Sequence, residues 1–197
     1  MNARTDQELL RPYAETCSET AFAGLVRRHV DLVYSSALRL VGDAHFAKDV
    51  TQEIFVALAR NAAQLVRHPT LSGWLHRNAQ NLAANVVRAN VRRQAREQES
   101  AMNQPLTAES ATSWANLAPH LEVALGELSE ADADAVLLRY FERKSAVEMA
   151  TVLGISEEAA QKRVSRAVEK PREMFAKRKI GVGVKELTAA SSKTLDD

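Results

Sequence analysis

The apolar residues of this chain recur at three- and four-residue steps, and this period constrains the fold more than any other feature of the sequence. The clearest stripe begins at residue 22 and consists of Phe22, Val26, Val30, Val33, Ala37, Leu40 and Val41. Residues at this spacing share one face of an α-helix, whereas a half-buried strand would alternate every second residue. Gly42 follows the stripe directly, and glycine is common just beyond a helix end. The sequence therefore predicts an amphipathic helix over residues 22–41.

Two further helices of the same kind are expected before residue 96. Asp43 can cap the first of them, which should end near Asn61. A loop with Pro69 follows, and the next helix should start near Leu71 or Ser72. The inward stripes of the two helices are Ala47, Val50, Ile54 and Leu58, and then Leu75, Ala79, Leu82 and Val86. Three amphipathic helices joined by short loops predict a helical bundle as the first domain, residues 1–96.

The remainder of the chain predicts a linker, a second helical domain and a tail. Residues 97–120 are rich in Gln, Ser, Thr, Asn and Pro, which is typical of a flexible linker. Helical periodicity resumes at Leu121, so a smaller helical domain is expected over residues 121–179, with a loosely ordered tail over 180–197. Scarce glycine, proline and aromatic residues agree with an all-α fold of two small helical domains.

A helix-turn-helix is predicted inside the second domain. Ser145 and Glu148 have the spacing of a capping box, so a helix should begin there and end at Gly154. Ser156 can then cap a second helix. Two helices joined by a short glycine turn form the helix-turn-helix motif, whose second helix often enters the major groove of DNA. The polar side chains expected on or beside the outer face of that second helix are Gln161, Lys162, Arg163, Ser165 and Arg166.

Positive charge is concentrated in the first domain although the formal net charge of the chain is only +1. No Asp or Glu occurs between Glu53 and Glu97, whereas seven arginines do: Arg60, Arg67, Arg77, Arg88, Arg92, Arg93 and Arg96. On the predicted third helix a polar ridge lies opposite the apolar stripe and consists of Arg77, Asn81, Asn85, Arg88 and Arg92. Such a ridge suits a phosphate backbone, and a solvated surface without a partner is the alternative.

The loop before this helix carries groups that could hold an unstacked base: Asn61, Gln64, Arg67 and His68. An ordinary polar connection explains the same residues equally well.

The predicted second helix has an acidic outer face, formed by Asp49, Gln52, Glu53 and Val56, with Phe55 at its edge. Carboxylates repel DNA, so this face suits a protein partner, and a solvated acidic face is the alternative.

Taken together, residues 19–175 resemble the extracytoplasmic-function (ECF) sigma factors of bacterial RNA polymerase. The resemblance implies that Asp49, Gln52, Glu53 and Phe55 bind core RNA polymerase. It implies that the promoter minus-ten element is bound by Asn61, Arg67, His68, Trp74, Arg77, Asn81, Arg88 and Arg92. It assigns the minus-thirty-five element to Gln161, Lys162, Arg163, Ser165 and Arg166. The expected partners are core polymerase and promoter DNA, and the resemblance also admits an anti-sigma factor.

Neither catalysis nor a cofactor is expected. The histidines are scattered, with His68 and His76 expected at the surface or facing DNA, and the lone Cys17 has no partners at zinc spacing. Asp132 and Asp134 are too small a cluster for a metal-dependent nuclease. A cytoplasmic protein without membrane contact is expected, because no signal segment opens the chain and no apolar run could span a bilayer.

Two alternatives and two departures from the family accompany this interpretation. A stand-alone helix-turn-helix regulator would leave the Asp49 face unexplained, and a module that binds only protein would leave the arginine block unexplained. Where the family usually has leucine, this chain has Pro171, which should kink or end the recognition helix. The tail beyond Arg178 receives no role from the resemblance.

Overall fold

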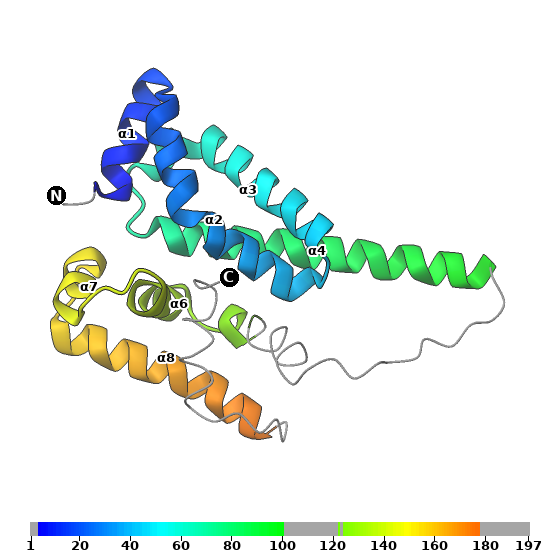
Figure 1. The fold of residues 1–197 in the computed structure, drawn as a ribbon. Coiled ribbons are helices and arrows are strands. Elements are labelled where there is room, and N and C mark those ends of the chain that lie inside the picture. The colour runs from blue at the N-terminus through cyan, green and yellow to red at the C-terminus, as the bar shows by residue number, and fades with distance from the viewer. Residues whose placement is uncertain (1–3, 101–121, 123, 178–197) are drawn as a thin grey trace.

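The computed structural model describes residues 4–100, 122 and 124–177, and every regular element among them is a helix. Four helices form the first bundle: α1 (Asp6–Thr16), α2 (Glu19–Val41), α3 (Ala44–Leu65) and α4 (Leu71–Ser100). The second bundle contains α6 (Glu130–Val136), the π-helical turn η1 (Leu137–Phe141), α7 (Ala146–Leu153) and α8 (Glu157–Lys177). Figure 1 shows α1–α4 packed together, with α6–α8 lying along one side of them. The all-α, two-domain prediction is confirmed.

The core of the first bundle takes in most of the predicted stripes of α3 and α4 but only part of that of α2. Val33 and Ala37 of α2 are buried against α3 and α4, and Leu25, which lies outside the predicted stripe, is buried with them. The other predicted residues of the α2 stripe are only partly buried against this core: Phe22, Val26, Val30, Leu40 and Val41. Asp43 caps α3 by accepting from the backbone amides of residues 45 and 46, and Gly42 ends α2 in the left-handed conformation. These are the start and stop positions that the sequence indicated.

Helix α1 was not predicted. A capping box between Thr5 and Glu8 starts it, and Leu9 and Leu10 are buried in the core of the first bundle. Asp6 fixes its first turn to α2, because its carboxylate accepts a hydrogen bond from Arg28 at 2.6 Å and lies 3.0 Å from Nε2 of buried His29. The first bundle therefore has four helices instead of three.

Several predicted boundaries move. Helix α2 begins at Glu19 because Ser18 caps it, and α3 continues beyond Asn61 to Leu65. Helix α4 starts at Leu71 as expected but runs to Ser100, beyond the predicted linker boundary at residue 96. In Figure 1 it extends well past the other helices of its bundle. Of the predicted linker, residues 97–100 belong to α4. The remaining linker residues and the predicted tail over residues 180–197 lie outside the described residues.

The helix-turn-helix has the predicted local structure. Ser145 and Glu148 form the capping box of α7, Gly154 ends that helix with a positive φ, and the hydroxyl of Ser156 accepts from the amide of Ala159 at the start of α8. Met149 and Ala160 are buried together with Ala135 and Leu138. Pro171 was expected to kink or end the recognition helix, and it does not end it, because α8 continues to Lys177. Proline removes one amide donor there, yet the helix bonds on either side remain available.

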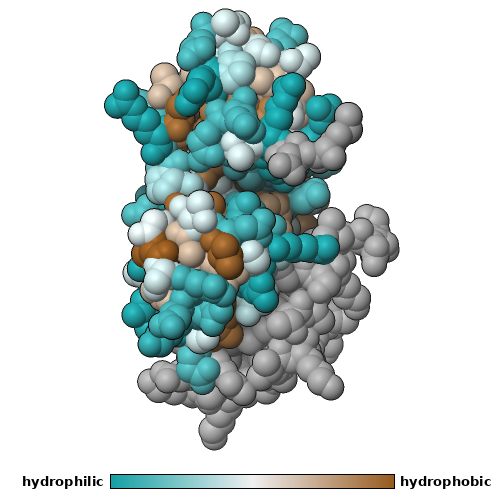
Figure 2. Space-filling view, turned by 90° about the vertical axis from the view of Figure 1, so that its left-hand side faces the viewer, coloured by the Kyte–Doolittle hydropathy of each residue, from teal (hydrophilic) through white to brown (hydrophobic). Residues whose placement is uncertain are grey.

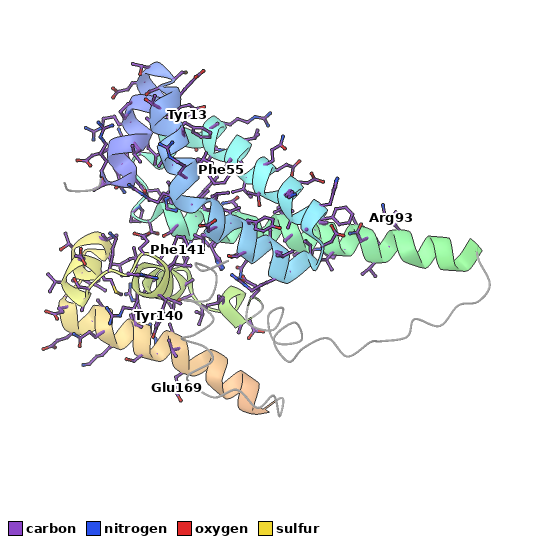
Figure 3. The ribbon with its side chains drawn as sticks, viewed as in Figure 1. Tyr13, Phe55, Arg93, Tyr140, Phe141 and Glu169 are labelled. Carbon is purple, nitrogen blue, oxygen red and sulfur yellow. The ribbon has the colours of Figure 1, made fainter. Side chains whose placement is uncertain are left out.

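The two bundles contact each other directly in this structure. Helix α4 packs against α6 and against η1. Figure 3 shows Phe141 of η1 on the side of the second bundle that faces the first, and its ring stacks with that of His29 at a centroid separation of 6.5 Å. Across the described part of the chain, no helix has the length and hydropathy needed to cross a bilayer.

Candidate nucleic-acid interface

The polar ridge of α4 is exposed along its distal half. Asn81, Asn85, Arg88 and Arg92 all face solvent. The Arg88 guanidinium donates to Oδ1 of Asn85 at 2.6 Å, and Nε of Arg92 donates to the backbone carbonyl of Arg88 at 3.2 Å. The ridge therefore presents cations and amides in a row along one helix, the arrangement that suits repeated phosphates.

The proximal residues of the same helix have different surroundings. The side chain of Arg77 is 26% exposed, and its guanidinium pairs with Asp134 at 2.9 Å and with Glu130 at 2.6 Å, both in the second bundle. Trp74 is half-buried and packs against the core of the first bundle. Neither side chain lies in the open row formed by the distal residues.

The predicted base-binding loop is shorter than expected because α3 extends into it. Asn61 lies on that helix, where its side-chain amide donates to the carbonyl of Ala57 at 2.7 Å. Arg67 is exposed in the connection, and Nδ1 of His68 accepts from the amide of Thr70 at 3.3 Å. Arg67 therefore has the most open position of the three.

The outer face of α8 carries most of the predicted groove-reading side chains. Gln161, Lys162 and Ser165 are exposed, whereas Arg163 is half-buried. Arg166 is also exposed, at 64% of its side chain, but its guanidinium reaches back to donate to Asp132 at 2.6 Å. Lys162 is thus more open to a ligand than Arg166, whose guanidinium already has an anionic partner inside its own bundle.

The residues predicted for the acidic face of α3 are exposed to solvent, with the exception of Phe55. Asp49 is 61% exposed and lies 3.2 Å from Nδ1 of His45, and Gln52 and Glu53 face solvent. Val56, next to them, is 40% exposed. Phe55 is different, because only 8% of it is exposed and it belongs to the core of the first bundle. Its burial leaves the three polar residues and Val56 as the accessible part of this face.

The sequence analysis did not predict that three carboxylates of the second bundle are buried: Glu122, Asp132 and Asp134. Glu122 accepts from Nε of Arg39 at 2.7 Å and lies 3.2 Å from Nε2 of His76. Burial alone would raise the pKa of Glu122, but the hydrogen bond with His76 and the charge of Arg39 outweigh burial and lower the pKa to about 2. His76 was expected at the surface and is instead 2% exposed, because this carboxylate covers it.

A sequence signal for these acids does exist. Asp134 precedes the apolar Leu137 and Leu138 by three and four residues, and Glu122 precedes Leu125 by three. An acid at the spacing of an apolar stripe is placed on the buried face of its helix, where it needs a partner. Within the described residues no group of three or more His, Cys, Asp or Glu could hold a metal ion.

Family comparisons match both bundles. The family model described as Sigma-70 region 2 matches residues 25–93, and the one described as Sigma-70, region 4 matches residues 121–170. The first range contains the α4 ridge and the acidic face of α3. The second contains the helix-turn-helix.

The curated proteins that this chain resembles are also sigma factors. The chain is 32% identical over 157 residues to the ECF RNA polymerase sigma factor SigE of Mycolicibacterium smegmatis, covering 78% of this chain and 61% of that protein. It is 28% identical to the probable RNA polymerase sigma factor RfaY of Xanthomonas campestris, covering 79% of this chain but 40% of that protein. The sigma factor CarQ of Myxococcus xanthus is 28% identical, with 84% and 95% covered. The chain thus spans less than two thirds of the length of the first two relatives.

Among solved structures, that of CnrH in complex with the cytosolic domain of CnrY is similar, with a TM-score of 0.44, 25% identity, and 87% and 97% of the two chains covered. The two sigma-70 regions occur in order, and relatives of the ECF type match across both of them. On these grounds the chain belongs to the extracytoplasmic-function group of RNA polymerase sigma factors.

Proposed function

We propose that this chain binds core RNA polymerase and directs it to promoters. The first bundle would hold polymerase through the acidic face of α3 and the melted minus-ten element through the α4 ridge. The second bundle would read the duplex minus-thirty-five element through α8. The observation that carries the proposal is the exposure of two separate polar faces, on α4 and on α8, in two different bundles.

The chemistry of these faces supports the division of labour. The segment from residue 54 to residue 96 contains no carboxylate, so α4 itself carries no group that repels phosphates. The carboxylates that reach the ridge are those of Glu130 and Asp134, at Arg77. The α3 face carries Asp49 and Glu53 and would repel DNA, which favours a protein surface there. The family consists of transcription initiation factors and is not a family of enzymes, and chemistry would be left to the polymerase. An anti-sigma protein is a further proposed partner, and a cytoplasmic location is proposed because the polymerase works there.

Co-purification with core polymerase tests the role of the acidic face. Both acids are exposed, so Asp49→Ala combined with Glu53→Ala should leave the helical content unchanged. The double variant should weaken binding to core by a few kcal/mol, as a loss at an interface hot spot does. Glu15→Ala combined with Asp31→Ala removes the same charge from exposed positions of α1 and α2 and is the matched control. Equal core binding by the two double variants would refute the proposed polymerase surface.

A further inference from the structure

The polar side chains on the outer face of α8 differ in what holds them. The side-chain amide of Gln161 donates to exposed Glu157 at 3.2 Å, and the hydroxyl of Ser165 donates to the backbone carbonyl of Gln161 at 3.1 Å. Both of these hydrogen bonds lie within α8 and are exposed to water. The guanidinium of Arg166 instead donates to Asp132 of α6 at 2.6 Å, and the side chain of Asp132 is only 3% exposed. Arg166 is therefore held by a buried group of a second helix.

Asp132 has a fixed position in the first turn of α6. The hydroxyl of Ser129 caps this helix by accepting from the backbone amide of Asp132 at 3.3 Å. Helices α6 and α8 pack against each other (Figure 1), and Ala133 and Ala167 are buried in the same apolar cluster. These two alanines directly follow Asp132 and Arg166 in the sequence, and small side chains at a contact allow two helices to approach closely. The short side chain of aspartate can therefore reach the guanidinium.

The hydrogen bond to Asp132 leaves most of the guanidinium of Arg166 available. Asp132 engages one of its terminal nitrogens, whereas a guanidinium carries several N–H donors in a planar fork. The side chain of Arg166 is 64% exposed, so the other donors can be reached from the outer face of α8. Arginine uses such a fork to recognise the O6 and N7 atoms of guanine in the major groove. The anchored side chain can thus still bind a base edge.

Anchoring changes what an arginine contributes to binding. A long side chain that moves freely loses rotamer freedom when it binds, and this loss opposes binding. Asp132 already restricts Arg166 in the free chain, so less freedom remains to be lost. The orientation of the guanidinium matters more for a base edge, whose acceptors have fixed positions, than for a phosphate, which serves mainly to position the protein on the duplex. The anchor therefore favours base recognition by Arg166.

We propose that Asp132 is a positioning residue for promoter recognition, which orients the guanidinium of Arg166 towards one base pair of the minus-thirty-five element. The proposal rests on the proposed function, because it takes α8 as the helix that recognises duplex DNA. Asp132 is buried and acts through Arg166 without touching DNA itself. Its substitution should therefore alter the discrimination between base pairs at one position more than it alters binding to all sequences alike.

The test compares variants of the full chain in which the charge of one buried aspartate is removed. Asp132→Asn keeps nearly the same side-chain volume, so the fold is retained, but it replaces the charge-assisted hydrogen bond to Arg166 with a weaker one. Asp134→Asn is the matched control, because Asp134 is a buried aspartate of the same helix whose hydrogen bonds go to Thr70 and Arg77 of the first bundle.

The orientation of Arg166 is measured first, on the free chain. Its Nε–Hε signal in heteronuclear NMR spectra, assigned by its loss in Arg166→Lys, reports the motion of the guanidinium. The order parameter of this group should exceed about 0.6 in the parent and in Asp134→Asn, and should fall below that value in Asp132→Asn. Equal order of Arg166 in the parent and in Asp132→Asn would overturn the proposal without any use of polymerase or DNA.

Base discrimination is measured next, with the full chain bound to core polymerase. Selection from duplexes of random upstream sequence defines the element that the parent complex prefers, and substitution of each base pair gives the discrimination at that position. Arg166→Lys should lower the discrimination about tenfold at one base pair. Asp132→Asn should lower it by at least about threefold at the same base pair and leave the other positions at the parent level. Asp134→Asn should match the parent at every position.

The outcomes separate this inference from the proposed function. A parent complex that prefers no upstream element would refute the proposed function and, with it, the positioning role. A clear preference that Asp132→Asn leaves unchanged, or weakens equally at every position, would overturn the positioning role alone. The double variant of Asp132→Asn and Arg166→Lys should discriminate no worse than Arg166→Lys. Additive losses would contradict the proposal, because Asp132 would then act without Arg166.

Discussion

At the scale of single residues, charge and burial separate the groups that are available to a ligand from those that hold the protein together. Lys162 and Arg166 lie on the same helix, but only Arg166 donates to a buried carboxylate, that of Asp132. The sequence places both side chains on the outer face and does not distinguish them, because Asp132 lies 34 residues away along the chain.

Substitution of these two residues should therefore give different results. Lys162→Ala should weaken binding to a minus-thirty-five duplex by about 1 to 3 kcal/mol if it contacts a base edge, and should leave stability unchanged. Arg166→Ala should also lower the free energy of unfolding by roughly 1 kcal/mol, because Asp132 loses a charged hydrogen bond. Urea unfolding of both variants checks this, and equal midpoints for the two would contradict it.

Glu122 gives the structure a defined dependence on pH. Burial raises the pKa of Glu122, but the hydrogen bond with His76 and the charge of Arg39 lower it by more, from 4.5 to about 2. A lowered pKa means that the charged form stabilises the docked arrangement fully above about pH 4.5 and loses this effect as the pH falls towards 2. The difference between these two pKa values corresponds to a stabilisation of the docked arrangement on the order of 3 kcal/mol.

Glu122→Gln should accordingly loosen the contact between the bundles at pH 7 and have little further effect near pH 2.5. The loosening is measured as the distance between spin labels on the exposed Cys17 and on Thr151→Cys of α7, by double electron-electron resonance from pH 7 downwards. Other acids titrate in the same range, so the quantity to compare is the difference between parent and variant at each pH. A difference that stays constant from pH 7 to pH 2.5 would rule out the role assigned to the charge of Glu122.

At the scale of helices, local signals predicted most of the elements because their causes are local. Asp43, Gly42, Ser145 and Gly154 each act on backbone groups within a few residues, and each lies at the expected helix end. Helix α1 was missed because its short apolar pair, Leu9 and Leu10, becomes informative only when α2 covers it. The continuation of α3 past Asn61 likewise depends on burial of Ala62 and Leu65 in the bundle core.

Helix α8 offers a prediction of its own, because it runs through Pro171 to Lys177. Pro171→Leu should raise the thermal stability of the second bundle, since leucine restores one backbone hydrogen bond and removes a ring clash. The gain in local helix preference should be up to about 3 kcal/mol. Thermal unfolding followed by circular dichroism checks it. An unchanged midpoint would mean that α8 is not sufficiently formed at this position to gain from the substitution.

At the scale of the whole molecule, sequence periodicity predicted two helical bundles but not how they meet. The residues that join them come from positions such as Arg39 and Glu122, which are 83 residues apart, and no local pattern links such pairs. The surface of each bundle remains largely hydrophilic. The face in Figure 2 carries only separate apolar spots, and the large exposed apolar residues within the described part of the chain are Val56, Val91 and Val147. Much of the candidate site could therefore be predicted from the sequence, whereas the contact between the two bundles required the structure.

We propose that this chain recognises promoters as a subunit of polymerase. The chain is nearly neutral overall, with a formal net charge of +1, so neither the α4 ridge nor the outer face of α8 should bind DNA tightly alone. The decisive measurement is a mobility-shift titration of the purified chain on promoter duplex at physiological salt, with and without core polymerase. Specific binding is expected only with core, over a site with two dissimilar elements. Tight binding without core to a symmetric operator would contradict it and would identify a stand-alone regulator.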